Sequence, residues 1–110
     1  MGRLLYGDGR MPILIEDRAL AHLKVVISTK LRRGESFTVS WRHPDDQPQG
    51  RSTIWVHPTI PLRFEFDSSE PTELNPVWIE HLSNSTYVAG ILLVPESSTD
   101  GELTISPADE

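Results

Sequence analysis

The stretch from residue 17 to residue 41 constrains the fold more than any other, because it reads as a helix, a glycine stop and an alternating strand. No glycine or proline occurs in Arg18–Arg33, and Asp17 is a favourable N-cap residue in front of it. Gly34 then provides the left-handed residue that commonly ends a helix. Apolar residues recur at the spacing of one helical face: Leu20, Leu23, Ile27 and Leu31. The sequence therefore predicts one amphipathic helix that ends at Gly34.

The strand predicted at Ser36–Arg42 alternates between apolar and polar side chains, which is typical of a sheet with one buried face. We expect the apolar stripe of the helix to pack on this face. The residues expected to meet in the core are Leu23, Ile27, Phe37, Val39, Phe64 and Phe66. The helix side expected to stay open carries Ala21, His22, Val25, Ser28, Thr29 and Arg32.

Turn signals and short alternating runs predict the remaining elements. Asp8-Gly9 predicts a hairpin turn between strands at 3–7 and 11–16. Further strands are predicted at 53–57, 62–67 and 91–94, and Asn75-Pro76 predicts the start of a second helix. The order is β-β-α-β-β-β-α-β. The sequence therefore predicts an α+β fold, a mainly antiparallel sheet with two helices packed on one face.

The chain of 110 residues is long enough for one domain with its own core. We expect this domain to span residues 1–96, and residues 97–110 to form an acidic, mostly flexible tail in which only 103–105 could add an edge strand. Cysteine is absent, which excludes disulfides and thiolate chemistry. No apolar run approaches the roughly 20 residues of a membrane span, and the N-terminus lacks signal-peptide features. The expectation is a cytoplasmic protein without a membrane partner.

Charge is unevenly distributed along the chain, whose formal net charge is −6. All ten lysines and arginines fall within residues 1–63, which hold six acids and therefore carry +4. Residues 64–110 hold ten acids and no base, and carry −10. Such a division suggests a basic binding face with an acidic tail, or two halves that interleave into an ordinary solvated surface.

Catalytic motifs and metal-ligand spacings are not found in the sequence. The four histidines have no partners at metal-ligand spacing. His43 with Asp45 and Asp46 fits a solvated loop better than a metal site. No nucleophile motif and no phosphate-binding glycine loop occurs. The sequence therefore favours a protein without enzymatic activity, metal or cofactor.

Trp55 is the most distinctive candidate for a binding residue. Strand alternation places Ile54 and Val56 toward the core and Trp55 and His57 on the opposite, open face of the sheet. An exposed tryptophan beside cations can stack on nucleic-acid bases or be buried by a protein partner. Packing across strands, or cover by a loop, would instead make Trp55 structural. The cations proposed to act with Trp55 are Arg32, Arg33, Arg42 and Arg63.

Four blocks carry a family resemblance: DRALAHLKVVISTKLRRGESFTVSW, RSTIWVHPTIPLRFEF, NPVWIEHL and ILLVPE. They resemble a family of short proteins of unknown function from actinobacteria and their phages, over about Arg3 to Glu96. Many relatives carry the label ATP-dependent DNA ligase. Such a ligase needs the lysine of a Lys-x-Asp-Gly motif. Asp8-Gly9 follows Tyr6-Gly7 and Asp100-Gly101 follows Ser98-Thr99, so neither has that lysine, and the sequence does not support the label.

Two interpretations of function follow from these patterns. The first is a small interaction module that binds itself, as a homodimer, or another protein. The second is an accessory factor that binds nucleic acid through an arginine-rich face made of Arg32, Arg33, Arg42, Arg51 and Arg63. The net charge of −6 counts against this interpretation.

Overall fold

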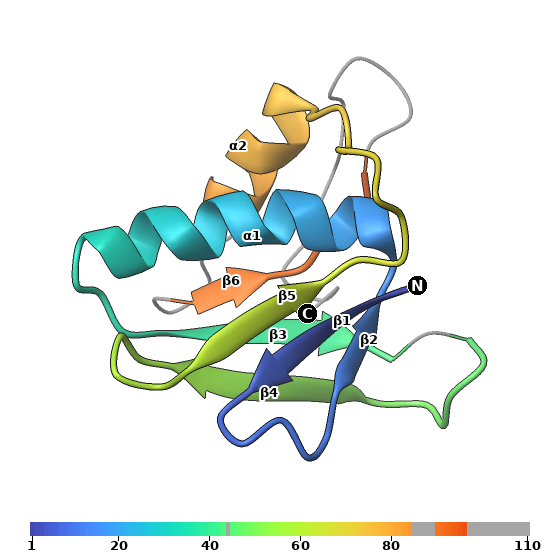
Figure 1. Cartoon of the computed structure of the whole chain (residues 1–110), viewed down its shortest axis with the longest axis horizontal. Coiled ribbons are helices and arrows are strands. Elements are labelled where there is room, and N and C mark those ends of the chain that lie inside the picture. The colour runs from blue at the N-terminus through green and yellow to red at the C-terminus, as the bar shows by residue number, and fades with distance from the viewer. Residues whose placement is uncertain (44, 85–89, 97–110) are drawn as a thin grey trace.

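The computed structural model describes residues 1–43, 45–84 and 90–96. Within these ranges the chain forms six strands and two helices in the predicted order, and the α+β class is confirmed (Figure 1). Their bounds are β1 (Gly2–Tyr6), β2 (Ile13–Ile15), α1 (Asp17–Arg32), β3 (Phe37–Arg42), β4 (Arg51–Val56), β5 (Leu62–Glu65), α2 (Pro76–Asn84) and β6 (Gly90–Leu92). Neither helix is long and apolar enough to cross a membrane. The strand considered at 103–105 lies outside the described residues.

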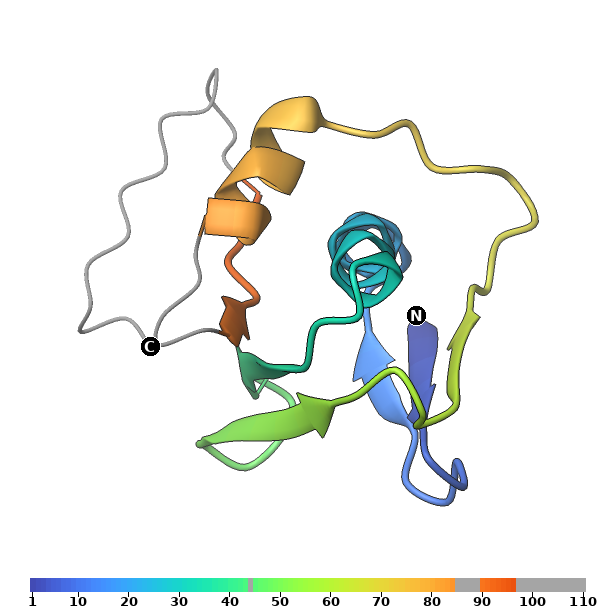
Figure 2. The same cartoon turned by 90° about the vertical axis from the view of Figure 1, so that its left-hand side faces the viewer.

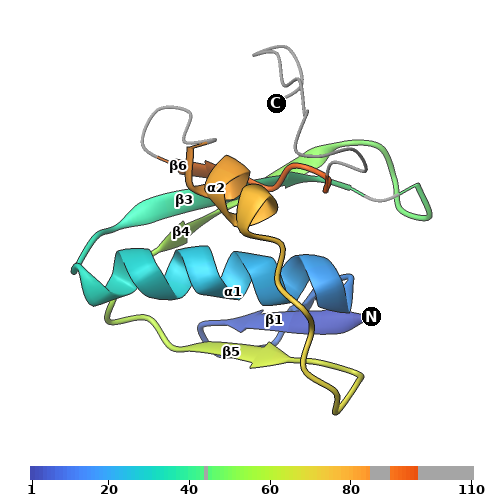
Figure 3. The same cartoon turned by 90° about the horizontal axis from the view of Figure 1, so that it is seen from above.

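The strands form two three-stranded sheets rather than the single sheet expected from the sequence. One sheet has the order β2-β1-β5 and the other β4-β3-β6. Their strand pairs are antiparallel except β3 with β6, which is parallel. Seen along α1, the strands lie in an arc around that helix, and α2 lies near β6 (Figure 2). The segment between β5 and α2 passes around the remaining side of α1 (Figure 3).

The core lies between α1 and the inner faces of the two sheets. Leu23 and Ile27 are fully buried there, together with Phe37 and Val39 of β3, as predicted. Two further predicted core residues are partly buried at the border of this cluster: Phe64 and Phe66. On β4, Val56 is fully buried and Ile54 is partly buried, so the predicted facing of this strand is also confirmed.

The start of α1 differs from the prediction. The helix begins at Asp17, but Glu16 holds the N-cap position and makes no side-chain cap hydrogen bond within the described structure. The Asp17 carboxylate instead accepts hydrogen bonds from the backbone N–H groups of Asp67 at 3.2 Å and Ser68 at 3.0 Å. The predicted N-cap role of Asp17 is therefore wrong, because its carboxylate is used to hold the chain that follows β5.

The end of α1 follows the prediction. Gly34 has a φ of 73°, the left-handed conformation that glycine adopts without strain. Its N–H donates to the carbonyl of Leu31 at 2.9 Å, and the N–H of Glu35 donates to the carbonyl of Lys30 at 3.2 Å. These two bonds form the Schellman motif that satisfies the last carbonyls of a helix.

His22 is fully buried, so the expectation that it lies on the open side of α1 is wrong. Its Nδ1 lies 2.7 Å from the carbonyl of Arg18, and its Nε2 accepts the backbone N–H of Asn75 at 2.8 Å. The ring also packs against Trp78 of α2, with a distance of 4.5 Å between ring centres. Asn75 caps α2, as predicted, by accepting a hydrogen bond from the N–H of Val77 at 3.0 Å. The residue that caps α2 is thus the one that His22 binds.

Gly90 allows β6 to approach β3 closely. A Cβ atom at residue 90 would clash with Oγ1 of Thr38 and lie 3.2 Å from the carbonyl oxygen of Thr38. The glycine therefore permits the parallel pairing of Thr38 with Gly90 and Ser40 with Leu92. The described strand covers 90–92, somewhat earlier than the predicted 91–94.

Candidate functional site

Trp55 lies on the open face of the sheet β4-β3-β6, where the sequence places it. Its side chain is 55% exposed, and Thr38 is its direct partner across β3. Ser40 pairs with Thr53 next along the face, and their hydroxyl oxygens lie 2.8 Å apart. The other outward-facing pair of the two strands is Arg42 with Arg51. We call the surface formed by Thr38, Ser40, Arg42, Arg51, Thr53 and Trp55 the open face.

The structure places His57 just beyond the end of β4 and Arg63 on the other sheet. His57 follows β4, and its Nδ1 lies 2.8 Å from Oγ1 of Thr59 and accepts the N–H of Thr59 at 3.1 Å. Arg63 belongs to the other sheet, where β5 pairs it with Leu5 of β1, and its Nε lies 3.0 Å from Glu65. Of the arginines predicted to act with Trp55 or to bind nucleic acid, Arg42 on β3 and Arg51 on β4 thus lie on the same pair of strands as Trp55.

Arg32 and Arg33 lie at the far end of α1, and their surroundings differ. Arg33 lies outside the last turn and forms an ion pair of 3.3 Å with Glu35. Arg32 instead lines a groove along the helix. The predicted arginines therefore do not form one cluster with Trp55.

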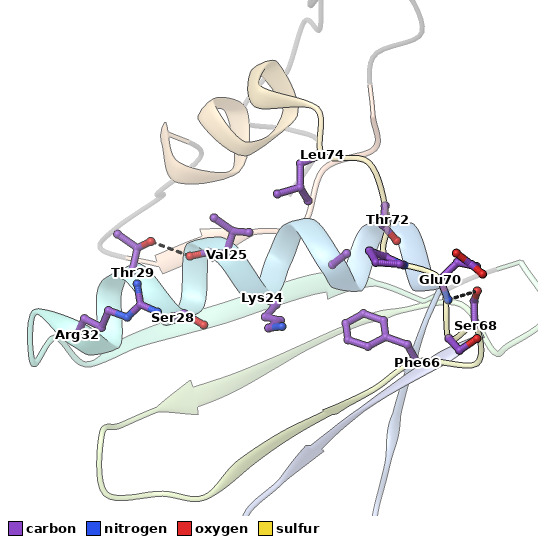
Figure 4. Close-up of a pocket in the computed structure, with 13 residues that line it drawn as sticks. Lys24, Val25, Ser28, Thr29, Arg32, Phe66, Ser68, Glu70, Thr72 and Leu74 are labelled. Carbon is purple, nitrogen blue, oxygen red and sulfur yellow. Dashed lines mark hydrogen bonds between the residues drawn. The ribbon is translucent and has the colours of Figure 1, made fainter.

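A groove of about 480 Å³ lies between α1 and the segment from Phe66 to Leu74 (Figure 4). The helix wall consists of Ala21, Lys24, Val25, Ser28, Thr29 and Arg32. The opposite wall consists of Phe66, Ser68, Ser69, Glu70, Pro71, Thr72 and Leu74. Most residues of this helix wall lie on the side of the helix that the sequence predicts to be open, whereas no pattern in the sequence places residues 66–74 opposite it. We call this site the helix groove.

Two cations of the helix groove differ from the other cations of the protein. Arg3, Arg10, Arg18, Lys30, Arg33 and Arg63 have carboxylate partners within 4 Å, and Arg42 and Arg51 also have interaction partners. Lys24 and Arg32 have no carboxylate partner within the described ranges. The ammonium of Lys24 lies 5.9 Å from the ring centre of Phe66. Within the described residues, the helix groove thus contains two positive charges that have no carboxylate within 4 Å.

A hydrogen-bond network closes the domain beside the helix groove. Glu96 accepts two hydrogen bonds from Arg18, from Nε at 2.8 Å and from Nη2 at 2.7 Å. Asn75 donates to the same carboxylate at 2.8 Å, and Nη1 of Arg18 donates to the carbonyl of Glu73 at 2.8 Å. The hydrogen bonds from Arg18, and then that from Asn75, lower the pKa of Glu96 from 4.5 to about 2. Burial opposes this shift but is the smaller effect.

Metal binding has no support from the described geometry. Among the described residues, no group of three or more His, Asp or Glu side chains could hold an ion. His43, the candidate weighed with Asp45 and Asp46, has one ring nitrogen in a hydrogen bond with its own loop and the other in a hydrogen bond with β4. Nδ1 lies 3.0 Å from the carbonyl of Pro48, and Nε2 lies 2.7 Å from the hydroxyl of Ser52.

The fold defines this protein as a small α+β domain. The family model described as Domain of unknown function (DUF7882) matches residues 1–96. The chain belongs to this family. No curated protein and no solved structure matches it. The family match ends at Glu96, the residue whose carboxylate closes the Arg18 network.

Proposed function

We propose that this protein is a small non-enzymatic interaction module that associates with a second copy of itself through the open face and the free edge of β4. The main support for this proposal is the exposure of Trp55. This large apolar side chain is 55% exposed and lies on β4, an edge strand of its sheet. Large exposed apolar surfaces on a folded domain commonly mark interaction sites.

The edge of β4 supplies a second reason for self-association. Among the described strands β4 pairs only with β3, so no described strand pairs with its other edge. The six residues Arg51–Val56 contain no proline and only a single charged residue. A strand edge of this composition can pair with a strand of another chain. Antiparallel pairing of β4 with its copy would obey two-fold symmetry, the commonest arrangement of homo-oligomers.

Trp55 would supply much of the affinity of such a dimer. Tryptophan is enriched among the few interface residues that cost more than about 2 kcal/mol when truncated. The polar residues around Trp55 are mostly hydroxyl-bearing, namely Thr38, Ser40 and Thr53, and they suit the rim of an interface. The net charge of −6 opposes association at low salt. We therefore expect dimerisation to strengthen as salt screens this repulsion.

Size-exclusion chromatography with light scattering tests the proposal on the full chain over a range of concentrations. We expect Trp55→Ser to weaken association and to leave the circular dichroism spectrum unchanged. Met11→Ser is the matched control, because Met11 is more exposed than Trp55 at 83% but lies outside the open face. A wild-type chain that stays monomeric, or a Trp55→Ser chain that associates as before, would refute the proposal. Unfolding of Trp55→Ser would show that Trp55 is a structural residue.

The second candidate function is nucleic-acid binding, favoured by one observation. Arg42 and Arg51 are direct cross-strand partners on the same face as Trp55, so one surface combines cations with a stacking side chain. Adding a single-stranded oligonucleotide to the same chromatography experiment tests it. Binding that weakens steeply with salt and is lost in Arg42→Gln/Arg51→Gln would support this function. The cations Arg32, Arg33 and Arg63 lie on other elements and would contribute only if the bound strand were long enough to reach them.

The remaining expectations from the sequence stay part of this proposal. We infer that the ligase label of similar proteins does not describe this chain, because the Lys-x-Asp-Gly lysine is missing. A cytoplasmic location, an actinobacterial or phage origin and a partner other than itself also stay predictions.

A further inference from the structure

We propose that the acidic segment 97–110 of this same chain docks in the helix groove. The helix groove is a different surface from the open face, so docking there does not depend on self-association through Trp55. Three features support docking: the chemistry of the groove walls, the composition of the segment and the point where the segment leaves the described fold.

The helix groove combines an apolar floor with positive charge on one wall. Phe66, Leu74 and Val25 provide its main apolar contacts, and Leu74 is 44% exposed in the described structure. Lys24 and Arg32 lie on the helix wall, eight residues and therefore about 12 Å apart along the helix axis. Glu70 stands on the opposite wall, away from both cations (Figure 4). A complementary ligand is an extended segment with apolar side chains and acids directed toward α1.

The two cations are available to such a ligand. Lys24 and Arg32 lack a carboxylate partner within the described ranges, although the chain has six more acids than bases. The hydroxyl of Thr29, on the same helix wall, already donates to the carbonyl of Val25 at 2.8 Å. The charges of Lys24 and Arg32 therefore define the specificity of the site for carboxylates.

The segment 97–110 has the matching composition. It contains no lysine or arginine and four acids, Asp100, Glu102, Asp109 and Glu110. Leu103 and Ile105 lie between the two acidic pairs and are separated by one residue, so they share one side of an extended chain. The acids at both ends of this apolar pair are carboxylates that could pair with Lys24 and Arg32, while Leu103 and Ile105 could contact the apolar residues of the groove.

The segment begins at the rim of the groove. Glu96 is held by Arg18 and by Asn75, the residue that directly follows Leu74 of the groove wall. The fourteen residues after Glu96 could extend up to about 46 Å. The groove runs from Ala21 to Arg32, about 17 Å along the helix. The segment is thus long enough, and its attachment at the rim gives a high effective concentration.

Paramagnetic relaxation on the full chain tests the proposal. The protein has no cysteine, so Ser106→Cys creates a single attachment site for a nitroxide label in the segment. We expect the label to weaken the amide signals of Lys24, Val25, Ser28 and Thr29 strongly, and those of Arg42 and Thr53 on the open face little. We also expect the effect to decline as salt is raised, because both cations are solvent-exposed.

Charge variants of the labelled chain provide the controls. Lys24→Gln/Arg32→Gln should restore the groove signals, whereas Arg10→Gln/Arg63→Gln removes the same charge from exposed sites elsewhere and should not. Undiminished groove signals in the labelled wild type, or equal effects of the two double variants, would overturn the proposal. A mixture of labelled unenriched chain with unlabelled ¹⁵N chain should show no effect. Weakened groove signals in this mixture would assign the site to the segment of a second copy and overturn docking within one chain.

Discussion

Arg18 and Glu96 join the first turn of α1 to the last described residue through two parallel hydrogen bonds, although 78 residues separate them in the chain. This bidentate geometry is the strongest form of an arginine–carboxylate contact. Arg18 also binds the carbonyl of Glu73, and Glu96 binds Asn75, so one ion pair holds the start of α1, the cap of α2 and the chain after β6.

Glu96→Gln should therefore destabilise the domain, by about 1–2 kcal/mol, because the charged partner of Arg18 is lost. We choose the lower part of the usual range because the Arg18 side chain is partly exposed and solvent screens the pair. Urea denaturation at neutral pH measures this change. Glu80→Gln, at an exposed position on α2, is the matched control and should change the unfolding free energy little.

The same carboxylate predicts an acid-dependent loss of stability. The folded-state pKa of Glu96, about 2, lies below its ordinary value of 4.5. Its contribution is complete above about pH 4.5 and is lost as the pH falls toward 2, because the unfolded chain takes up the proton first. Between pH 6 and pH 2.5 the wild-type protein should therefore lose more stability than Glu96→Gln does. Parallel pH profiles of the two proteins would argue against this assignment.

Leu23→Ala should cost about 2–5 kcal/mol, the range for truncating a buried leucine. Leu23 is fully buried on the helix face that meets β3. The matched control is Leu14→Ala on β2, where the same atoms are removed from a side chain that is 44% exposed. Denaturant unfolding of both variants gives the comparison. A loss below about 0.5 kcal/mol for Leu23→Ala would mean that the core assignment is wrong.

His22→Leu should destabilise the protein by about 1–3 kcal/mol, because it leaves the partly buried N–H of Asn75 without its acceptor. Leucine is also apolar, so the loss of stability reports the hydrogen bonds of His22 and its contact with Trp78. His57→Leu is the control, since the described hydrogen bonds of the His57 side chain are made to Thr59 in the same turn. Thermal unfolding of the two variants distinguishes a buried structural histidine from a turn histidine. Equal melting temperatures would contradict this role of His22.

Incubation with labelled ATP and a divalent cation should leave the protein unlabelled, because the lysine of a Lys-x-Asp-Gly motif is absent. A DNA ligase of that type in the same assay is the positive control. A stable lysine-linked adenylate on this protein would overturn our inference about the ligase label.

Local patterns predicted the elements because each signal acts within a few residues. Gly34 ends α1 through its own backbone freedom, and Asn75 caps α2 through a carbonyl two residues from its partner. Alternation in β4 placed Trp55 outward and Val56 inward for the same reason. Asp17 shows the limit of such signals, because its carboxylate binds N–H groups fifty residues away. Local capping preference could not reveal that competitor.

The sequence by itself determined the α+β class, the element order, the buried stripe of α1 and the outward position of Trp55, since periodicity and turn chemistry specify which side of each element is apolar. Only the tertiary structure decided which strand edges meet. It divided the strands into two sheets, paired β6 in parallel with β3 through the close approach of Gly90, and placed Arg63 on a different sheet from Trp55. It also buried His22 under α2 and brought residues 66–74 opposite α1. These outcomes depend on contacts between residues far apart in the chain, and a periodic pattern carries no information about its distant partner.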